Sequence, residues 1–319
     1  MMRLLTICLA TALSTQAFAA DPPKPKTSYL TAEAAGPDFA VQGEYVGKIG
    51  DMPLGMQVIA LGNGEFEAVV YPGGLPGAGW DGETKHKGTG KTEDGVTVFR
   101  SDEGELKIQD GTAVISTPDS KGELVKTERQ SPTLGAKPPA GATVLFDGSN
   151  VDAWTNGRLS PEKLLMVGTR TKEKFGDFTL HLEFRTPFMP YARGQARGNS
   201  GMYLQDQYEC QVLDSFGLEG ADNECGGIYK NSKPKVNMCF PPLTWQTYDV
   251  EFTTAKLDDS GKIATPAKTT IRHNGVVIHE NLEIRPTPGG GQNSGAPGAL
   301  FLQDHGDPVF FQNIWIVKK

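Results

Sequence analysis

The stretch GDFTLHLEFR, residues 176–185, alternates apolar and polar side chains. Leu182 and Phe184 point to one face, while Glu183 and Arg185 point to the other, as the period of two in a β-strand requires. A strand with one apolar face must bury that face against a second layer of structure. This stretch therefore predicts a sheet that covers a hydrophobic core on one side.

Similar short strands recur on both sides of this stretch, from about Val144 to the end of the chain. They are separated by Gly, Pro, Asn and Asp turns, and no helical pattern of convincing length interrupts them. Eight or more strands with alternating faces are typical of a two-sheet sandwich or jelly roll. We therefore expect an all-β sandwich over residues 144–319.

A smaller β domain is predicted over residues 39–131. Its alternating segments are bounded by Gly and Asp turns and indicate a meander of about six strands. The glycine-rich loop at 73–91 carries Trp80, which either serves a binding loop or covers the core, and we favour the core. A Pro/Gly-rich linker is expected at 132–143. An extended, largely disordered leader is expected at 20–38, in which Tyr29 and Leu30 could dock on the folded part.

The first residues, MMRLLTICLATALSTQAFAA, predict a signal peptide over residues 1–19, with a positive charge, an apolar run and a small-x-small cleavage site. The apolar run is shorter than the roughly 20 residues that span a bilayer. We therefore expect a periplasmic or secreted protein with no membrane span. The net charge of −7 and the lack of a basic tract argue against a nucleic-acid partner and suit a neutral ligand.

Three cysteines lie beyond the predicted signal peptide: Cys210, Cys225 and Cys239. An oxidising compartment favours one disulfide and one remaining thiol. We expect Cys225 to pair with Cys239, because both lie in a loop-rich stretch, although one sequence leaves the connectivity open. Cys210 lies within a predicted strand and is expected to be a buried thiol.

The stretch YECQVLDS, residues 208–215, carries polar side chains within an apolar pattern. Glu209 and Gln211 lie two residues apart, so they share one face of a strand. Asp214 would join that face if a bulge intervened near Val212. Neighbouring carboxylates raise one another's pKa, which suits acid–base catalysis. We predict catalytic roles for Glu209 and Asp214.

The stretch LQDHG, residues 302–306, places His305 beside Asp304 at the end of an apolar strand. A carboxylate keeps a neighbouring imidazole oriented and basic, which suits proton transfer near neutral pH. The alternative is a turn in which Asp304 caps the backbone and His305 is structural. We predict a catalytic role for His305.

Glu183 is expected on a strand beside that of Glu209, facing the same cleft, and is the fourth catalytic candidate. The alternative is a solvated pair with Arg185 on the strand surface. Glu183, Glu209 and His305 would also form a carboxylate–imidazole set compatible with a divalent metal ion. The metal signal is weak, because no HExxH motif or close ligand spacing occurs, and no other cofactor is indicated.

Short amide, hydroxyl and aromatic side chains near these stretches are candidates for holding a sugar. Amides and hydroxyls bond to sugar hydroxyls, and an apolar sugar face packs on an aromatic ring. Otherwise they are ordinary turn and core residues, the interpretation we prefer for Trp154, Trp315 and His273. The predicted substrate-binding residues are Asn199, Ser200, Tyr203, Gln211, Tyr229, Trp245, Gln303 and Asp304.

Six segments of residues 144–319 together resemble the 3-keto-disaccharide hydrolase family, in the family's order. The resemblance implies a concanavalin A-like sandwich with a concave face for a sugar. The loop FMPYARGQARG, residues 188–198, is longer than the family usually shows. The segments are LFDGSNVDAW (145–154), GDFTLHLEFR (176–185), NSGMYLQDQYECQVLDSFG (199–217), TWQTYDVEF (244–252), HNGVVIHEN (273–281) and LQDHGDPVFFQNIWI (302–316).

The resemblance also implies a sugar substrate in which a ring hydroxyl near the reacting centre is already a ketone, as in a 3-keto-disaccharide or 3-keto-glycoside. A ketone acidifies the hydrogen on the adjacent carbon, so one base, His305 or Glu209, can start an elimination that water addition completes. Two alternatives stay open. One is a non-catalytic, lectin-like module, and the other is a retaining glucanase that acts on unoxidised glycan.

Overall fold

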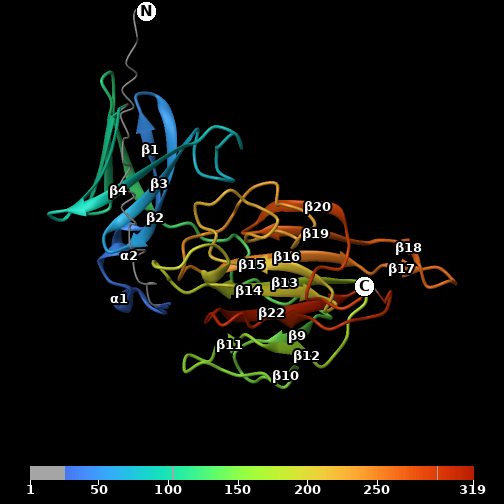
Figure 1. The fold of residues 1–319 in the computed structure, drawn as a ribbon. Coiled ribbons are helices and arrows are strands. Elements are labelled where there is room, and N and C mark those ends of the chain that lie inside the picture. The colour runs from blue at the N-terminus through green and yellow to red at the C-terminus, as the bar shows by residue number, and fades with distance from the viewer. Residues whose placement is uncertain (1–25, 103, 293) are drawn as a thin grey trace, which may run out of the picture.

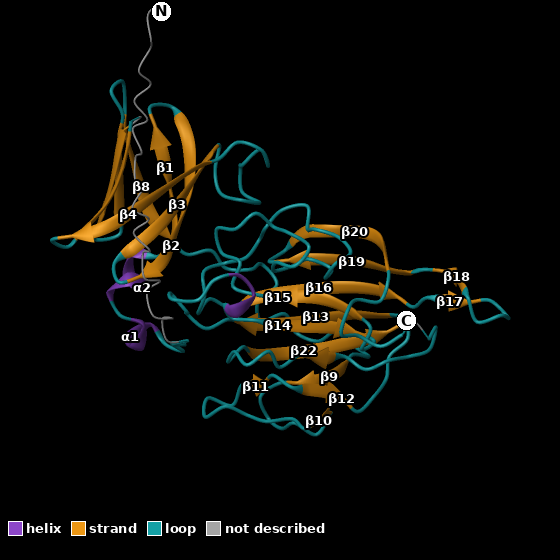
Figure 2. Ribbon diagram, in the orientation of Figure 1, coloured by secondary structure: helices purple, strands orange, loops and turns teal. Residues whose placement is uncertain are grey.

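The computed structural model describes residues 26–102, 104–292 and 294–319, and the predicted signal peptide at 1–19 lies outside them. A β-barrel and a two-sheet β-sandwich lie side by side (Figure 1). Strands dominate both, as Figure 2 shows, which confirms the all-β expectation. In the described residues, no helix has both the length and the apolar character needed to cross a membrane.

The N-terminal barrel contains eight antiparallel strands and closes where β1 pairs with β8. The expectation of about six strands was wrong, because β4 and β8 carry too few apolar residues to be recognised. β4 is mostly exposed, and β8 buries only Leu124. The strands are β1 (Gly43–Ile49), β2 (Met52–Gly62), β3 (Glu65–Pro72), β4 (His86–Glu93), β5 (Val96–Ser101), β6 (Gly104–Gln109), β7 (Thr112–Ser116) and β8 (Lys121–Thr127).

The segment before the barrel is described from residue 26, and Tyr29 docks on the folded part, as the sequence analysis allowed. Two short helices, α1 (Ala32–Ala35) and α2 (Pro37–Val41), follow an extended stretch. In that stretch, Tyr29 exchanges two backbone hydrogen bonds with Phe188 of the sandwich domain. The aromatic ring of Phe39 packs edge-on against Phe188. These contacts attach the leader to the loop at residues 188–198.

The C-terminal sandwich contains a five-stranded and a seven-stranded antiparallel sheet, which confirms the predicted architecture. A small hairpin, β17 (Lys256–Leu257) with β18 (Ile263–Thr265), projects at the end away from the barrel (Figure 1). The smaller sheet has the order β10 (Trp154–Thr155), β12 (Thr169–Thr171), β21 (Phe301–Leu302), β14 (Ser200–Leu204) and β15 (Tyr208–Val212). The larger has the order β11 (Leu165–Met166), β22 (Phe310–Lys318), β13 (Phe178–Arg185), β16 (Gln246–Thr253), β19 (Ala267–His273) and β20 (Val276–Ile284), with β9 (Thr143–Phe146) beside β22.

The core between the two sheets is built from alternate residues of their strands. Leu182 and Phe184 of β13 and Cys210 and Val212 of β15 all belong to it. Because side chains alternate along a strand, the residues between these point away from the core. The outward residues of β13 and those of β15, including Glu209, therefore lie on opposite sides of the sandwich.

The barrel and the sandwich share part of one hydrophobic core. Ile59, Val69 and Tyr71 of the barrel belong to the same cluster of buried residues as the sandwich core. Arg129, at the end of the barrel, donates two hydrogen bonds of 2.6 Å to the buried carboxylate of Glu44. Charged, bidentate contacts of this kind hold a precise geometry.

Four residues were assigned structural roles from the sequence: Trp80, Trp154, His273 and Trp315. Two of them are buried within the sandwich domain. Trp154 and His273 are buried, and His273 Nε2 lies 2.9 Å from the Gln246 side-chain oxygen. Trp80 packs against the core as favoured, with its ring 5.1 Å from that of Tyr71. Trp315 was wrongly placed in the core: it lies outside the larger sheet, stacked on a histidine ring.

The expected disulfide between Cys225 and Cys239 is absent, because all three described cysteines are free thiols. Cys225 Sγ lies 3.3 Å from the Tyr248 hydroxyl, and Cys239 Sγ lies 3.5 Å from the carbonyl oxygen of Leu213. The Cys225 and Cys239 thiols are also hydrogen-bond partners of each other, so the structure brings the expected pair together without a covalent bond. Cys210 is fully buried in β15, as expected.

Candidate active site

A row of polar residues crosses the outer face of the five-stranded sheet. β14 and β15 pair so that Tyr203 lies opposite Glu209 and Gly201 lies opposite Gln211. On the other side of β14, the backbone N–H of Gln303 donates a hydrogen bond to the backbone carbonyl of Gly201. Directly opposed residues share a face, so the sheet register gathers four sequence-predicted site residues, Tyr203, Glu209, Gln211 and Gln303.

Glu209 is the titratable centre of this row. The residue is 3% exposed, and burial raises the pKa of its carboxyl group to about 7 although a hydrogen bond from Tyr203 lowers it. The Tyr203 hydroxyl donates to Glu209 Oε2 over 2.9 Å and accepts from Gln303 Nε2 over 3.3 Å. A carboxyl group with a pKa near 7 exchanges protons readily at neutral pH, which suits a general base or acid.

Gly201 makes room for the Glu209 carboxyl group. A Cβ atom on Gly201 would lie 2.3 Å from Glu209 Oε1 and 3.0 Å from the Tyr203 ring. The carboxyl group therefore reaches across β14 and rests where any other residue would place its side chain. Gly201 therefore has a steric role at the site, because its lack of a side chain leaves the space that the Glu209 carboxyl group occupies.

Amide side chains lie within this row and beside it. Gln211 Nε2 donates a hydrogen bond to the side-chain oxygen Oε1 of Gln195 over 3.2 Å. Asn199 Nδ2 donates to the backbone carbonyl oxygen of Gln195 over 2.7 Å. The amide oxygens of Asn199, Gln211 and Gln303 are buried without a hydrogen-bond partner among the described residues. Amide oxygens accept hydrogen bonds from hydroxyl groups, so this set is suited to a polyhydroxylated ligand.

Gln195 is a site residue that the sequence analysis missed. It lies in a 3₁₀ turn, η1 (Gly194–Ala196), within the long loop at 188–198. Its two oxygen atoms fix the amide orientations of Gln211 and Asn199. The only signal in the sequence was the unusual length of this loop.

Two further segments cover the row from the open edge of β15. The backbone N–H of Tyr229 donates a hydrogen bond to the backbone carbonyl of Glu209, and the backbone N–H of Glu209 donates to Thr287 Oγ1. Gly289 rests against Tyr203, since a Cβ there would lie 3.3 Å from the tyrosine oxygen. Burial of the Glu209 carboxyl group, beside which these segments pack, is the cause of its raised pKa. Tyr229, a predicted sugar-stacking residue, therefore lies beside the site.

Glu183 does not share this cleft, so the expectation that it faces Glu209 was wrong. It lies outside the larger sheet, where it accepts hydrogen bonds from Asn313, Gln312 and the Gly135 amide and lies 3.2 Å from His181 Nε2. Burial acts to raise its pKa, but these hydrogen bonds outweigh burial and lower it. Glu183 thereby holds the segment predicted as a linker against the sandwich.

Asp214 is also separate from the Glu209 row. β14 and β15 pair in unbroken register from Leu204 with Tyr208 to Ser200 with Val212, so the predicted bulge is absent from this pairing. Asp214 follows the strand and is buried, with Oδ2 2.7 Å from Arg197 Nε. Burial raises its pKa, and Arg197 opposes that effect. A buried ion pair of this kind positions the loop at 188–198.

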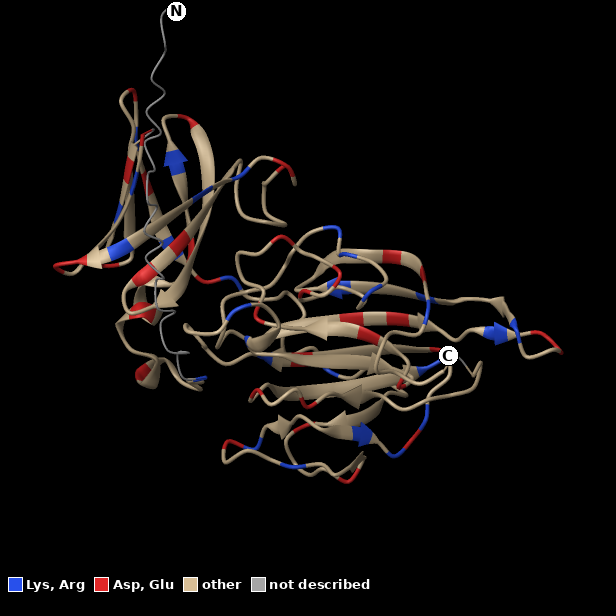
Figure 3. Ribbon diagram, in the orientation of Figure 1, with Lys and Arg blue, Asp and Glu red and all other residues tan. Residues whose placement is uncertain are grey.

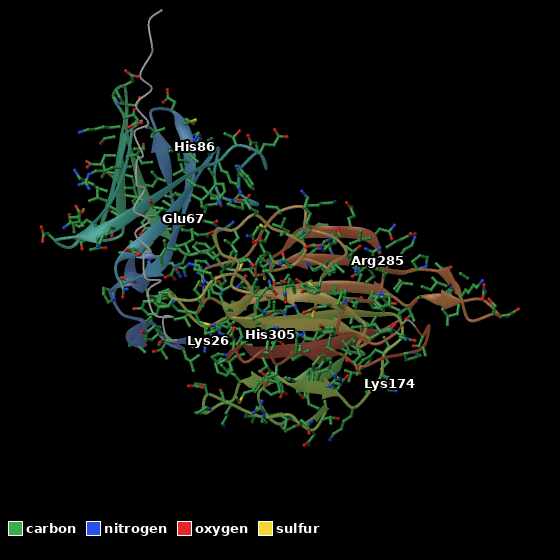
Figure 4. The ribbon with its side chains drawn as sticks, in the orientation of Figure 1. Lys26, Glu67, His86, Lys174, Arg285 and His305 are labelled. Atoms are coloured by element: carbon green, nitrogen blue, oxygen red, sulfur yellow. The ribbon has the colours of Figure 1, made fainter. Side chains whose placement is uncertain are left out.

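The turn after β21 carries three further predicted residues, Gln303, Asp304 and His305. His305 is exposed there, nearer the barrel than Lys174 is (Figure 4). Asp304 Oδ1 accepts from the Gly306 amide, so Asp304 caps this turn, as the alternative interpretation held. Ser200 Oγ donates to the Gln303 carbonyl and ties the turn to β14.

Trp245 lies at the start of β16 in the larger sheet, beneath the guanidinium group of Arg185 at 5.1 Å. It is therefore apart from the sheet that carries Glu209. The metal set inferred from the sequence is not assembled either, because Glu183 and Glu209 lie on opposite sides of the sandwich. Over the described ranges, no group of three or more His, Cys, Asp and Glu residues is placed to hold a metal ion.

The raised pKa of Glu209 predicts that stability falls as pH rises. Below the ordinary value of 4.5, folded and unfolded states are both protonated; between 4.5 and about 7, the unfolded state ionises first. At about 1.4 kcal/mol per pKa unit, ionisation of the folded state costs about 3 kcal/mol at higher pH. Glu209→Gln removes that cost.

Urea unfolding at several pH values measures this effect. The stability of Glu209→Gln relative to wild type should increase by about 3 kcal/mol between pH 4.5 and about pH 8. A relative stability that stays constant over this range would show that Glu209 has an ordinary pKa.

Residues 141–317 match the family model described as a 3-keto-alpha-glucoside-1,2-lyase-like domain. A crystal structure of a "putative glycosyl hydrolase" from Parabacteroides distasonis is 33% identical to the chain, with a TM-score of 0.52, and the match covers 57% of this chain and 85% of that one. A second crystal structure of a "putative glycosyl hydrolase" from the same organism is 19% identical to the chain, with a TM-score of 0.41, and the match covers 56% of this chain and 94% of that one. Among curated proteins, none matches the chain.

Proposed function

Because the chain belongs to the family of 3-keto-alpha-glucoside-1,2-lyase-like domains, we propose that it is an exported enzyme that cleaves the glycosidic bond of 3-keto-glycosides or 3-keto-disaccharides. Family membership and the glycosyl hydrolase-like neighbour make it a carbohydrate-active protein. The observation that carries the specific proposal is the buried Glu209 carboxyl with a pKa of about 7. The signal-peptide pattern at residues 1–19 supports export.

The chemistry needs one base. A ketone at C3 of the sugar ring acidifies the hydrogen at C2, and the ionised Glu209 removes that proton through Oε1. The electron pair forms the C1–C2 double bond as the C1–oxygen bond breaks, and the departing oxygen takes up the proton that Glu209 removed from C2, which restores the ionised carboxyl group. Water then adds across the double bond, so elimination and hydration together give net hydrolysis. Tyr203 orients the base by its hydrogen bond to Oε2.

The arrangement of carboxyl groups disfavours a glucanase mechanism. Retaining and inverting glycosidases need two carboxyl groups about 5–5.5 Å or about 6.5–9.5 Å apart across the scissile bond. Glu183 lies on the opposite side of the sandwich, and Asp214 is paired with Arg197. Elimination with a single base is consistent with this geometry. A lectin-like module, the second candidate, requires the amide acceptors but has no use for a carboxyl group with a pKa near 7.

The test offers 3-keto-trehalose and a 3-keto-glucoside beside their unoxidised parents, with and without a chelator. We expect sugar release from the keto substrates only, with an enone-type intermediate or its hydration product, and the chelator arm tells whether release depends on a divalent metal ion. Cleavage of the unoxidised sugars would overturn the elimination mechanism. Binding of both kinds of sugar without cleavage of either would support the lectin-like alternative.

A further inference from the structure

A pocket of about 380 Å³ lies on the outer face of the five-stranded sheet, beside the Glu209 row. It is formed by β12 and the residues just after it, by the turn between β14 and β15, and by the loop before β21. We call it the basic pocket, after the charged side chains that line it. Its residues used below are Arg170, Lys172, Lys174, Asp206 and Gln207.

The basic pocket and Glu209 are joined by one continuous row across the sheet. Arg170 lies opposite Phe301, Phe301 lies opposite Tyr203, and Tyr203 lies opposite Glu209. The Arg170 guanidinium carbon is 3.7 Å from the centre of the Phe301 ring, and the Phe301 and Tyr203 rings are 5.3 Å apart. Neighbouring strands lie about 4.8 Å apart, so Arg170 is about 14 Å from Glu209 along the sheet. A disaccharide with its substituents extends over a distance of this order.

The lining of the basic pocket carries excess positive charge. Arg170 is balanced by Asp206, whose carboxylate lies 3.0 Å from Arg170 Nε. Lys172 and Lys174 are exposed and have no acidic partner among the described residues, whereas Glu173 between them pairs with Lys318. The whole chain is acidic, with a charge of −7, and Figure 3 shows acidic and basic residues interspersed over both domains. A local surplus of two cations is therefore a feature of this pocket.

Gln207 gives an independent indication of a ligand. Its side chain lines the basic pocket and is 4% exposed, yet Gln207 Oε1 has no hydrogen-bond partner among the described residues. A buried amide oxygen without a partner costs free energy of roughly 1–3 kcal/mol. A hydroxyl group of a bound ligand would satisfy it, as at the amide oxygens of the Glu209 row.

These observations indicate the class of substrate. We propose that the basic pocket binds a carboxylate on the leaving part of the substrate, so that the enzyme prefers 3-keto-glycosides whose aglycone or second sugar is an acid. Lys172 and Lys174 attract the carboxylate, and Gln207 accepts a hydrogen bond from a hydroxyl group beside it. This inference rests on the proposed function, because it assumes that the oxidised ring is bound at Glu209.

The experiment compares matched acidic and neutral substrates. One pair consists of the 4-carboxyphenyl and 4-carbamoylphenyl 3-keto-glucosides, and the other of 3-keto-glucosyl-glucuronic acid and 3-keto-glucosyl-glucose. At low ionic strength we expect kcat/KM to be about fivefold higher for the acid, since each exposed ion pair contributes about 0.2–1 kcal/mol. The ratio should approach one at about 0.5 M salt, where exposed charges are screened. The pair that shows the preference tells whether the acid is aromatic or a uronic acid.

Two double variants locate the effect. Lys172→Gln with Lys174→Gln should reduce the acid-to-neutral ratio to about one without changing kcat/KM for the neutral member. Lys233→Gln with Lys262→Gln changes the net charge equally at exposed positions outside the pocket lining and should keep the wild-type ratio. A wild-type ratio of one for both pairs, or a preference that survives the Lys172 and Lys174 changes, would overturn the proposal.

Calorimetric titration with the unoxidised 4-carboxyphenyl and 4-carbamoylphenyl glucosides separates this inference from the proposed function. The acid should bind with a Kd about fivefold lower than the amide, and the Lys172 and Lys174 changes should remove the difference. If the acid binds preferentially but no keto-glycoside is cleaved, the proposed function fails and the basic pocket stands. Equal Kd values in the wild type would count against the pocket, whatever the enzyme cleaves.

Discussion

Glu209→Gln is expected to lower kcat/KM on a 3-keto-glycoside by about a thousandfold while the protein stays folded. A positioned general base contributes roughly 10²–10⁴ in rate, and the amide of glutamine cannot take up the proton. The substitution keeps the size of the side chain, and its amide oxygen can still accept the hydrogen bond from Tyr203. Loss of activity would therefore reflect loss of the base.

The pH profile gives a second readout of the same group. In the wild type, kcat/KM should rise with pH through an apparent pKa of about 7, because the carboxyl group must be ionised to act as a base. The residual activity of Glu209→Gln should lack this step. Glu183→Gln is the matched control, since Glu183 lies on the opposite side of the sandwich, and folded Glu183→Gln should keep activity within a few-fold of wild type. Full activity in Glu209→Gln would remove Glu209 from the mechanism.

Gly201→Ala is expected to lower kcat about a hundredfold. The added methyl group would lie 2.3 Å from Glu209 Oε1, so the carboxyl group must move by roughly an ångström or more. A displacement of about 1 Å at a reacting group can cost about 10² in rate. The displaced carboxyl group should also be better hydrated, which lowers its pKa and moves the midpoint of the pH profile below about 7.

Gly88→Ala supplies the control for this substitution. A Cβ on Gly88 of β4 meets nothing within 4 Å, and the residue lies in the barrel. Gly88→Ala should therefore keep wild-type kcat and the wild-type pH midpoint. If Gly201→Ala lowers kcat without moving the midpoint, the methyl group obstructs the substrate rather than the carboxyl group. Unchanged kcat and pH midpoint would contradict the observed placement of Glu209 over Gly201.

Much of the site was predictable because it depends on local periodicity. A period of two places Glu209 and Gln211 on one face of a strand, and the same rule separates Glu183 from the apolar residues on either side of it. The family resemblance then indicated a concanavalin A-like sandwich and a carbohydrate-active protein. The strands of the barrel were harder to predict. β4 has no alternation of apolar residues, so its sequence resembles a loop, and only its pairing with β3 and β5 in the structure identifies it as a strand.

The sequence placed Glu209 and Gln211 on one face of their strand and set Glu183 apart from its apolar neighbours, but it could not assign these strands to a sheet. Local periodicity depends on neighbours two residues away, whereas sheet membership depends on hydrogen bonds between segments far apart in the chain. That is why Glu183 was expected beside Glu209 and instead lies across the core from it. The pKa of Glu209 likewise depends on the burial of its carboxyl group and on the hydrogen bond from Tyr203, both of which arise only in the folded chain.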